Sequence, residues 1–237
     1  EAADVMVMEI DLDDLDPVAT QATVRRLAVD PRGRTLDILL GQPAYADATK
    51  RAAALGVDLS ALRGFEPWMA ALTITQVQLQ KMGFDSESGV EQQLLRLARR
   101  DGKEVRGLET LEEQLEAMDS LPPATQRAFL LQTLDEAATM EAQVGDIVSA
   151  WKAGDTATLE REFLAGLEDQ PELYRRIVVE RNRNWVARVR ALAADGKDYL
   201  VVVGTLHLVG PDSLIAMLGT AGLAPRQARA GDVVAAR

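Results

Sequence analysis

The sequence predicts a protein of the α/β (α+β) class: a helix-rich single domain with a small, mostly parallel sheet and an all-helical insertion. Short apolar runs at residues 5–10 and 199–203 have the length of buried strands, and residues 103–109 (KEVRGLE) form a third short predicted strand. Stretches with helical spacing separate the three. A helix, an Asp-Gly-Lys turn and a strand follow one another twice, at residues 101–103 and again at 195–197. This alternation is typical of parallel strands joined by helices.

Between the predicted strands, the apolar spacing predicts helices over residues 17–28, 44–55, 67–81 and 89–100. Thr110 and Glu113 have the spacing of a capping box, which marks the start of another helix. A long helical region opens at Pro122-Pro123 and runs to about residue 180. We interpret residues 122–180 as an insertion within one domain of residues 1–237, placed to act as a lid or a partner surface.

Composition narrows the classes of function. The chain has 237 residues, of which 47% are hydrophobic, so it can bury a core. The formal net charge of −11 argues against a nucleic-acid partner and against an anionic membrane surface. The absence of cysteine excludes disulfides, zinc–thiolate sites and thiol nucleophiles. No apolar run approaches the roughly 18 residues of a membrane-spanning helix.

The single histidine, His207, follows the most convincing buried strand. Gly204 breaks the apolar run, and Pro211 and Asp212 then open a helix that reads SLIAML. Ligands of open α/β sheets bind outside the carboxyl ends of parallel strands. A histidine there suits metal ligation or acid–base work, because neutral imidazole is available near pH 7. A structural histidine held in the loop is an equal alternative from position alone.

Glu9 and Glu109 also fall at the carboxyl ends of predicted parallel strands. Adjacent strands lie about 5 Å apart, so the two carboxylates and His207 are expected to share one crevice. Such a set suits a divalent metal ion (Mn, Co or Zn) with an open water position. Taken singly, each glutamate has a simpler reading: Glu9 as an exposed end residue, and Glu109 as the residue before the Thr110 cap.

Arg181 and Asn182 form a second candidate, on a predicted helix with apolar neighbours. Such a pair could aim a guanidinium at a carboxylate or a substrate carbonyl. Spacing alone favours a solvated face instead, because arginines crowd this segment: Arg175, Arg176, Arg181, Arg183, Arg188 and Arg190. Trp68 and Trp151 are interpreted as packing residues. A glycine-rich phosphate loop, a G-x-S-x-G elbow and HExxH are all absent, so nucleotide binding, serine hydrolysis and zincin chemistry are not favoured.

Several motifs in a fixed order carry a resemblance over nearly the whole chain. They are VMEID near the start, EPW at 66–68, GVEQQL at 89–94, GLET at 107–110, ERN at 180–182 and VGTLHLVGPDSL at 203–214. With these motifs the chain resembles the TraB/PrgY/GumN family, whose animal relatives are the Tiki membrane proteases. The resemblance implies an αβ core with a helical insertion and a periplasmic or secreted location.

The resemblance also implies a site built from two G-x-x-H motifs, acidic residues and an Arg–Asn pair. His207 matches the histidine of the second motif, and Glu9, Glu109, Arg181 and Asn182 match the polar site positions, with Glu91 a weaker candidate. In the Tiki branch the implied activity is metal-dependent peptide hydrolysis. Bacterial members are linked to pheromone shut-down and to polysaccharide gene clusters.

The leading hypothesis is a metal-dependent hydrolase of peptides or proteins. His207, Glu9 and Glu109 would hold the metal; Glu109, Arg181 and Asn182 would be catalytic, with a glutamate as base and Arg181 stabilising the oxyanion. The implied first G-x-x-H motif belongs ahead of the 5–10 strand, where this chain has no residues to supply it. We therefore expect weak or no activity in the chain as given.

The rival hypothesis is a non-catalytic periplasmic module that binds a peptide or a polysaccharide-export component. A small-ligand binder, on fold analogy with the erythromycin esterases or haem-binding ChaN, is a third. An unpaired sheet edge or the helical insertion would favour a homodimer.

Overall fold

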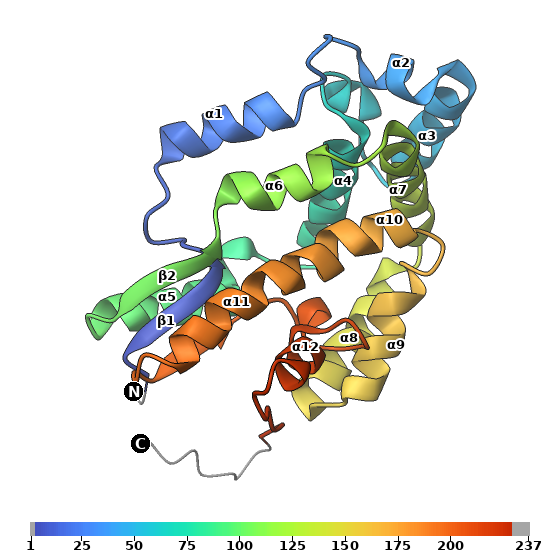
Figure 1. Cartoon of the computed structure of the whole chain (residues 1–237). Helices are drawn as coiled ribbons and strands as arrows, with labels where there is room; N and C mark the ends of the chain where they lie inside the picture. Colours follow the sequence, from blue (N-terminus) through green and yellow to red (C-terminus); the bar gives the residue numbers. More distant parts are fainter. Residues whose placement is uncertain (1–2, 229–237) are drawn as a thin grey trace.

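The computed structural model describes residues 3–228 and centres on a three-stranded parallel sheet (Figure 1). Its strands are β1 (Val5–Ile10), β2 (Glu104–Glu109) and β3 (Tyr199–Val202), in the order β2-β1-β3. Ile10 lies opposite Glu109, and Met8 lies opposite both Gly107 and Val202. The predicted α/β class with a small parallel sheet is confirmed, and all three carboxyl ends meet at one edge.

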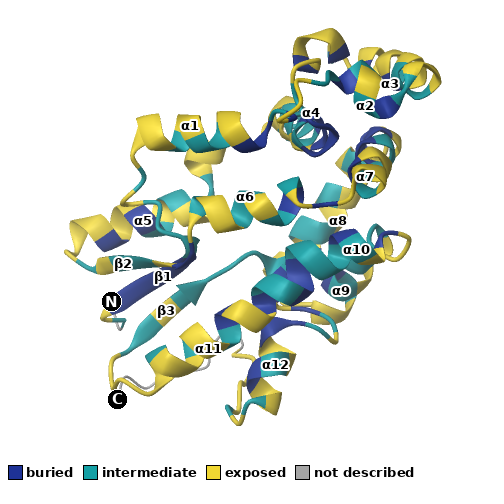
Figure 2. Cartoon of the chain, turned by 45° about the horizontal axis from the view of Figure 1, so that its top comes forward, coloured by how far each residue is buried: buried dark blue, intermediate teal, exposed yellow. Residues whose placement is uncertain are grey.

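Strand β1 is central because its side chains are apolar on both faces. Val5 and Val7 pack against Trp185 and Leu214 on one face of the sheet. Met6 and Met8 pack against Leu95 and Ala98 of helix α5 (Val90–Arg100) on the opposite face. Helices therefore cover both faces, and this explains why the run VMVM does not alternate with polar residues. Figure 2 shows β1 as a buried strand.

Each of the two Asp-Gly-Lys turns ends a helix and leads into a strand of the sheet. Helix α5 (Val90–Arg100) leads through Gly102 into β2, and helix α11 (Arg181–Ala193) leads through Gly196 into β3. Both glycines have positive φ, +62° and +83° respectively. A left-handed residue is the usual way to end a helix and redirect the chain, and glycine adopts it without steric cost.

Helices fill both connections between the strands. Between β1 and β2 lie α1 (Pro17–Leu27), α2 (Leu36–Leu40), α3 (Gln42–Ala54), η1 (Leu59–Leu62), α4 (Pro67–Lys81), η2 (Ser86–Ser88) and α5. Between β2 and β3 lie α6 (Leu111–Asp119), α7 (Pro123–Glu136), α8 (Met140–Ala153), α9 (Thr156–Ala165), α10 (Pro171–Tyr174), the π-helical η3 (Arg175–Glu180) and α11. After β3 come η4 (Thr205–His207) and α12 (Leu214–Thr220).

The two helical connections pack on one another rather than standing apart. Helix α4 packs against α7, and Ile74 and Leu130 lie in the core between them. Residues 123–180 are helical as expected, but they share this core with helices of the first connection. The start of this region therefore belongs to a helical layer that it shares with the first connection (Figure 1).

Two details depart from the sequence-based expectations. Trp68 is fully buried, as expected, whereas Trp151 is 50% exposed, so its assignment as a packing residue is wrong. The last helix begins at Leu214 rather than directly after Pro211, because Ser213 is its N-cap and accepts a hydrogen bond from the Ala216 N–H at 3.2 Å. Within residues 3–228, none of the helices combines the length and apolarity needed to cross a membrane.

Candidate functional site

The guanidinium of Arg181 lies at the meeting point of the three strand ends. Its Nη2 donates to Glu9 Oε2 and to Glu109 Oε1, each at 2.6 Å, and its Nε donates to Glu109 Oε1 at 3.0 Å. Its Nη1 lies 3.1 Å from His207 Nε2. The side chain of Arg181 is only 13% exposed. The Arg181 guanidinium therefore contacts one residue from each strand end: Glu9 of β1, Glu109 of β2 and His207 after β3.

The indole ring of Trp185 packs against the guanidinium of Arg181. Its indole Nε1 donates to Glu109 Oε2 at 3.0 Å, and its ring lies 4.8 Å from the guanidinium carbon of Arg181. The His207 ring packs against it at 4.5 Å between ring centroids. Trp185 lies one helical turn after Arg181 on α11, so both side chains reach the same face. A cation over an indole face is stabilised by the ring quadrupole.

Glu9 is held by three donors. Its Oε1 accepts from the Gly204 N–H at 2.7 Å, and its Oε2 accepts from Gln114 Nε2 at 3.0 Å as well as from Arg181. A Cβ at Gly204 would lie 3.2 Å from Glu9 Oε1, so glycine permits this close approach. Burial raises the pKa of Glu9, but the charge of Arg181 and the Gly204 hydrogen bond outweigh it and lower that pKa overall.

His207 is neutral, and its tautomer follows from its partners. Asn182 Nδ2 donates to the Asp212 carbonyl at 2.8 Å, which turns Asn182 Oδ1 toward His207 Nδ1 at 2.7 Å. The proton is therefore assigned to Nδ1, and the Nε2 lone pair accepts from Arg181. Burial, followed by the charge of Arg181, lowers the pKa of His207 to about 4, although Glu9 opposes the shift.

Arg181 and Asn182 are largely buried in the structure. The prediction from spacing, that their helix face is exposed to solvent, is wrong. Asn182 is 0% exposed, and both Arg181 and Asn182 contact His207 although they are consecutive residues. The π-helical segment η3 ends directly before Arg181. Such wide turns shift the register of a helix and are frequent at functional sites. Asn182 makes hydrogen bonds with both ends of its amide, so its role is to position His207.

Sequence reasoning missed two contributors to the cluster. Gln114 reaches Glu9 from helix α6, and Trp185 reaches Glu109 from α11. The capping box at Thr110 was the available signal for α6, because it sets the helix start and places Gln114 one turn inside it. Glu91, the weaker candidate, is exposed at the start of α5 and makes no contact with Arg181 or His207 that the structure records.

The donor set of Glu9, Glu109 and His207 has the composition of a divalent-cation site, but Arg181 fills its centre. Both carboxylates contact the same nitrogen of the guanidinium, and His207 Nε2 accepts from another. Across residues 3–228 no three or more acidic or histidine side chains are arranged to hold a metal ion. As arranged, these side chains do not fit a metal ion, and metal binding stays a prediction for a state in which Arg181 has turned away.

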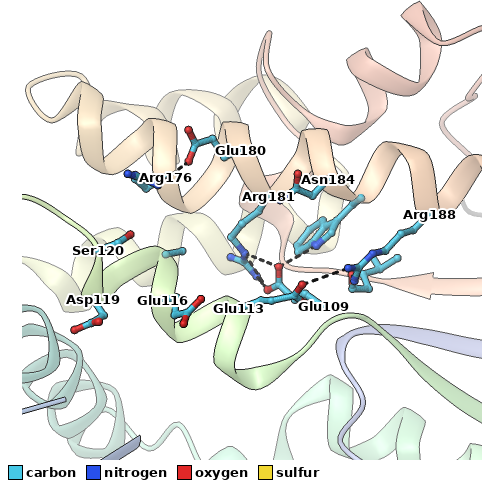
Figure 3. Close-up of a pocket in the computed structure, with 13 residues that line it drawn as sticks. Glu109, Glu113, Glu116, Asp119, Ser120, Arg176, Glu180, Arg181, Asn184 and Arg188 are labelled. Carbon is cyan, nitrogen blue, oxygen red and sulfur yellow. Dashed lines mark hydrogen bonds and ion pairs between the residues drawn. The ribbon is translucent and has the colours of Figure 1, made fainter. Parts of the chain in front are cut away.

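Cavities adjoin the cluster on more than one side. A cavity of about 450 Å³ lies between α6 and α11 and reaches Glu109 and Arg181 (Figure 3). A smaller one of about 230 Å³ reaches Glu9 and is also lined by Glu91 and Gln114. An apolar groove of about 640 Å³ runs among α4, α7, α8 and α9 and touches Ile177 and Leu206, next to the cluster in space and sequence. A ligand in the 450 Å³ cavity would therefore contact Glu109 and Arg181, and one in the 230 Å³ cavity would contact Glu9.

Comparison with known proteins identifies the family of the chain. The model of the TraB/PrgY/gumN family matches residues 1–227. Protein YbaP of Escherichia coli (strain K12) and that of Shigella flexneri are each 30% identical over 168 residues, which is 69% of this chain. The matched part spans 60% of the length of these relatives. No solved structure matches. The family match over nearly the whole length shows that the chain belongs to the TraB/PrgY/gumN family.

Proposed function

We propose that the Arg181 cluster is the reaction centre of a hydrolase acting on a peptide or protein substrate. The observation that carries the proposal is a buried guanidinium shared by two carboxylates and faced by a neutral histidine, at the carboxyl edge of a parallel sheet. The network also borders a cavity of about 450 Å³ that Glu109 and Arg181 line. Ligand binding at this edge is the rule for open α/β sheets.

Each side chain has a chemical part in the proposed reaction. Arg181 offers N–H donors to the oxyanion that forms when water attacks a carbonyl carbon. Glu109 lines the 450 Å³ cavity and acts as the base that accepts the proton of the attacking water. Asn182 is a positioning residue, because it fixes the tautomer of His207 and is fully buried.

The metal-dependent form of this hydrolase needs Arg181 to leave its present partners. A divalent ion bound by Glu9, Glu109 and His207 would contact the carboxylate oxygens that Arg181 now contacts. The ion and the guanidinium therefore exclude each other. Because Arg181 occupies the carboxylates, we expect this protein to be a weak or inactive enzyme. A periplasmic or secreted location belongs to the same proposal, and fractionation of cells that express the full gene tests it.

The first experiment compares wild type, Arg181→Met and Arg181→Met/His207→Ala after dialysis against Mn²⁺, Co²⁺ and Zn²⁺. We expect elemental analysis to find little metal in wild type, about one equivalent in Arg181→Met, and a loss in the double variant. Circular dichroism checks folding, and Arg181→Lys keeps the cation as a matched control. A folded Arg181→Met protein without metal would contradict the exchange. Peptidase activity that persists in a folded His207→Ala protein would contradict a role of the histidine in the reaction.

A binding module remains the second candidate, favoured by the apolar groove beside the cluster. The groove is lined by Leu72, which is partly exposed, and by Phe129 and Ile147. If the chain captures an apolar peptide there, Leu72→Glu should abolish binding whereas His207→Ala should leave it unchanged. Fluorescence polarisation with a labelled apolar peptide measures both. The reverse pattern, loss only in His207→Ala, would favour the reaction centre.

A further inference from the structure

The motif EPW, which the proposed reaction does not use, places a buried carboxylate far from Arg181. Glu66 is the N-cap residue of α4, yet its side chain makes no capping hydrogen bond. It is 7% exposed, and in the described part of the chain its carboxylate has one recorded hydrogen bond, accepted from Gln126 Nε2 at 2.9 Å. Burial raises the pKa of Glu66. A desolvated carboxylate with one neutral donor is left short of partners.

Gln126 is the second unusual residue at this place. Its Nε2 donates to Glu66 Oε2, and also to the carbonyl oxygens of Asp119 at 3.1 Å and Leu121 at 3.3 Å. Three acceptors around Nε2 determine the orientation of the amide. The side chain is only 5% exposed, and its Oε1 has no hydrogen-bond partner within residues 3–228. A buried acceptor without a donor costs about 1–3 kcal/mol.

Both residues line a cavity of about 370 Å³ in the helical layer. Asp119 and Asp30 also line it, but Asp30 is already paired with Arg34 at 2.6 Å. Neither Glu66 nor Asp119 has an ion pair among the residues that the structure describes. Burial raises the pKa of Asp119 as well. Two arginines line the cavity as well: Arg34, which is paired with Asp30, and Arg32, which is exposed. The cavity therefore offers buried acceptors that lack donors.

We propose that Glu66, Asp119 and Gln126 form a subsite for an organic ammonium or guanidinium group. Such a group supplies several N–H donors and one positive charge, which match two carboxylates and one amide oxygen. Leu39, Leu121 and Pro123 also line the cavity, and these apolar side chains suit the methylene stem that carries such a group. The ligand is a lysine or arginine side chain of a peptide, or a free amine.

The subsite is connected to the Arg181 cluster through helix α6. Glu109 directly precedes the helix and Asp119 ends it, and Asp119 lines both the 370 Å³ cavity and the 450 Å³ cavity that reaches Arg181 (Figure 3). A helix of this length spans about 13 Å, the reach of about four extended peptide residues. A basic side chain four residues from the reacting carbonyl would therefore reach Glu66. This placement rests on the proposed function, but the cation subsite itself does not.

Isothermal titration of the full chain tests the proposal with three probes. The probes are butylamine, a capped Gly-Gly-Lys-Gly-Gly peptide and the same peptide with norleucine in place of lysine. We expect butylamine or the lysine peptide to bind and the norleucine peptide to bind at least tenfold more weakly. Butylamine as tight as the peptide indicates a free-amine site, whereas a peptide that binds tenfold more tightly indicates a substrate subsite. No saturable binding of either amine overturns the proposal.

Substitutions locate the binding. Glu66→Gln and Asp119→Asn should each weaken amine binding at least tenfold, because each removes one carboxylate charge. Glu112→Gln, on the same helix as Asp119 but exposed and paired with Arg26, is the matched control and should bind like wild type. Unchanged binding in Asp119→Asn overturns the proposal even if Glu66→Gln fails to fold, since no hydrogen bond of the Asp119 carboxylate is recorded. Binding retained in His207→Ala separates the subsite from the proposed hydrolase.

Discussion

At the scale of single residues, Arg181 neutralises two neighbouring carboxylates, Glu9 and Glu109. The carboxylates at the ends of β1 and β2, half-buried Glu9 and buried Glu109, lie near each other, and leaving them unpaired would be costly. The guanidinium bridges them, while the Gly204 N–H and the Trp185 indole N–H satisfy further oxygen lone pairs. His207 stays neutral beside the cation and adds an acceptor rather than a charge. The polar groups of the cluster are therefore mutually satisfied in the absence of a ligand.

Replacing Arg181 should destabilise the protein strongly. We expect Arg181→Met to lower the free energy of unfolding by about 3–5 kcal/mol, because it leaves Glu9 and Glu109 as buried carboxylates without a cation. Arg161→Met, which removes an exposed ion pair with Glu162, should change it by less than about 1 kcal/mol. Urea denaturation measures both. Equal effects in the two variants would mean that the Arg181 network contributes no more than a surface pair.

The low pKa of His207 predicts how stability changes with acidity. The folded pKa of about 4 lies below the ordinary value of 6.5, so between these values the unfolded state binds more protons. Stability should therefore be complete above about pH 6.5 and fall by about 2–3 kcal/mol as the pH drops toward 4. Urea midpoints at several pH values measure this, with His207→Gln as the control that should show a flatter slope. An equal slope in both proteins would refute the assignment to His207.

At the scale of elements, helix α6 connects the two polar sites of the molecule. It begins directly after Glu109, carries Gln114 to Glu9, and ends at Asp119 beside Gln126. Its start is defined by the Thr110–Glu113 capping box, in which the Glu113 N–H donates to Thr110 Oγ1 at 3.1 Å. The predicted capping box is confirmed. A local signal at one helix end thereby determines where two distant side chains lie.

Removing this cap should have a small, measurable cost. We expect Thr110→Ala to lower the free energy of unfolding by about 1 kcal/mol, because the Glu113 N–H loses its side-chain acceptor. Thr110→Ser keeps the hydroxyl and is the control, expected to be close to wild type. Chemical denaturation followed by far-ultraviolet circular dichroism is the measurement. A Thr110→Ala protein as stable as wild type would show that tertiary packing alone holds the helix start.

At the scale of the whole molecule, the sheet with its covering helices and the helical layer meet without a linker. Trp185 lies in the core below the sheet, and Trp68 lies in the core of the helical layer, where it packs with Leu173 from the second connection. Both strand connections contribute to that layer. The helical layer is thus held together by residues of both connections.

This arrangement predicts a single cooperative unfolding transition. Trp68→Phe/Trp151→Phe leaves Trp185 as the reporter of the sheet, and Trp185→Phe/Trp151→Phe leaves Trp68 as the reporter of the helical layer. Each double variant should show a fluorescence midpoint that coincides with its own circular-dichroism midpoint, as expected for one domain. Midpoints that separate in either variant would divide the chain into two units and contradict the single-domain prediction.

How much of the site could be predicted depended on the range of the interactions involved. The strand that carries Glu9 follows from a short apolar run, and the strand that carries Glu109 follows from its place between an Asp-Gly-Lys turn and the Thr110 cap. These positions were therefore predicted from local pattern. Arg181 was not assigned to the site by spacing, because one arginine among six on a helix has no local mark of burial. Gln114 was missed for the same reason, since its partner Glu9 is 105 positions away in sequence.

The sequence by itself determined the class of the fold, the order of its elements and the family of the chain, because these depend on local periodicity, turn residues and ordered motifs. Only the tertiary structure decided which charge lies at the centre of the site. The guanidinium of Arg181 is brought there by the π-helical turn before α11 and by the indole of Trp185 beneath it. Contacts between residues far apart in the chain select among side chains that look equivalent in sequence, and burial then sets their charge states.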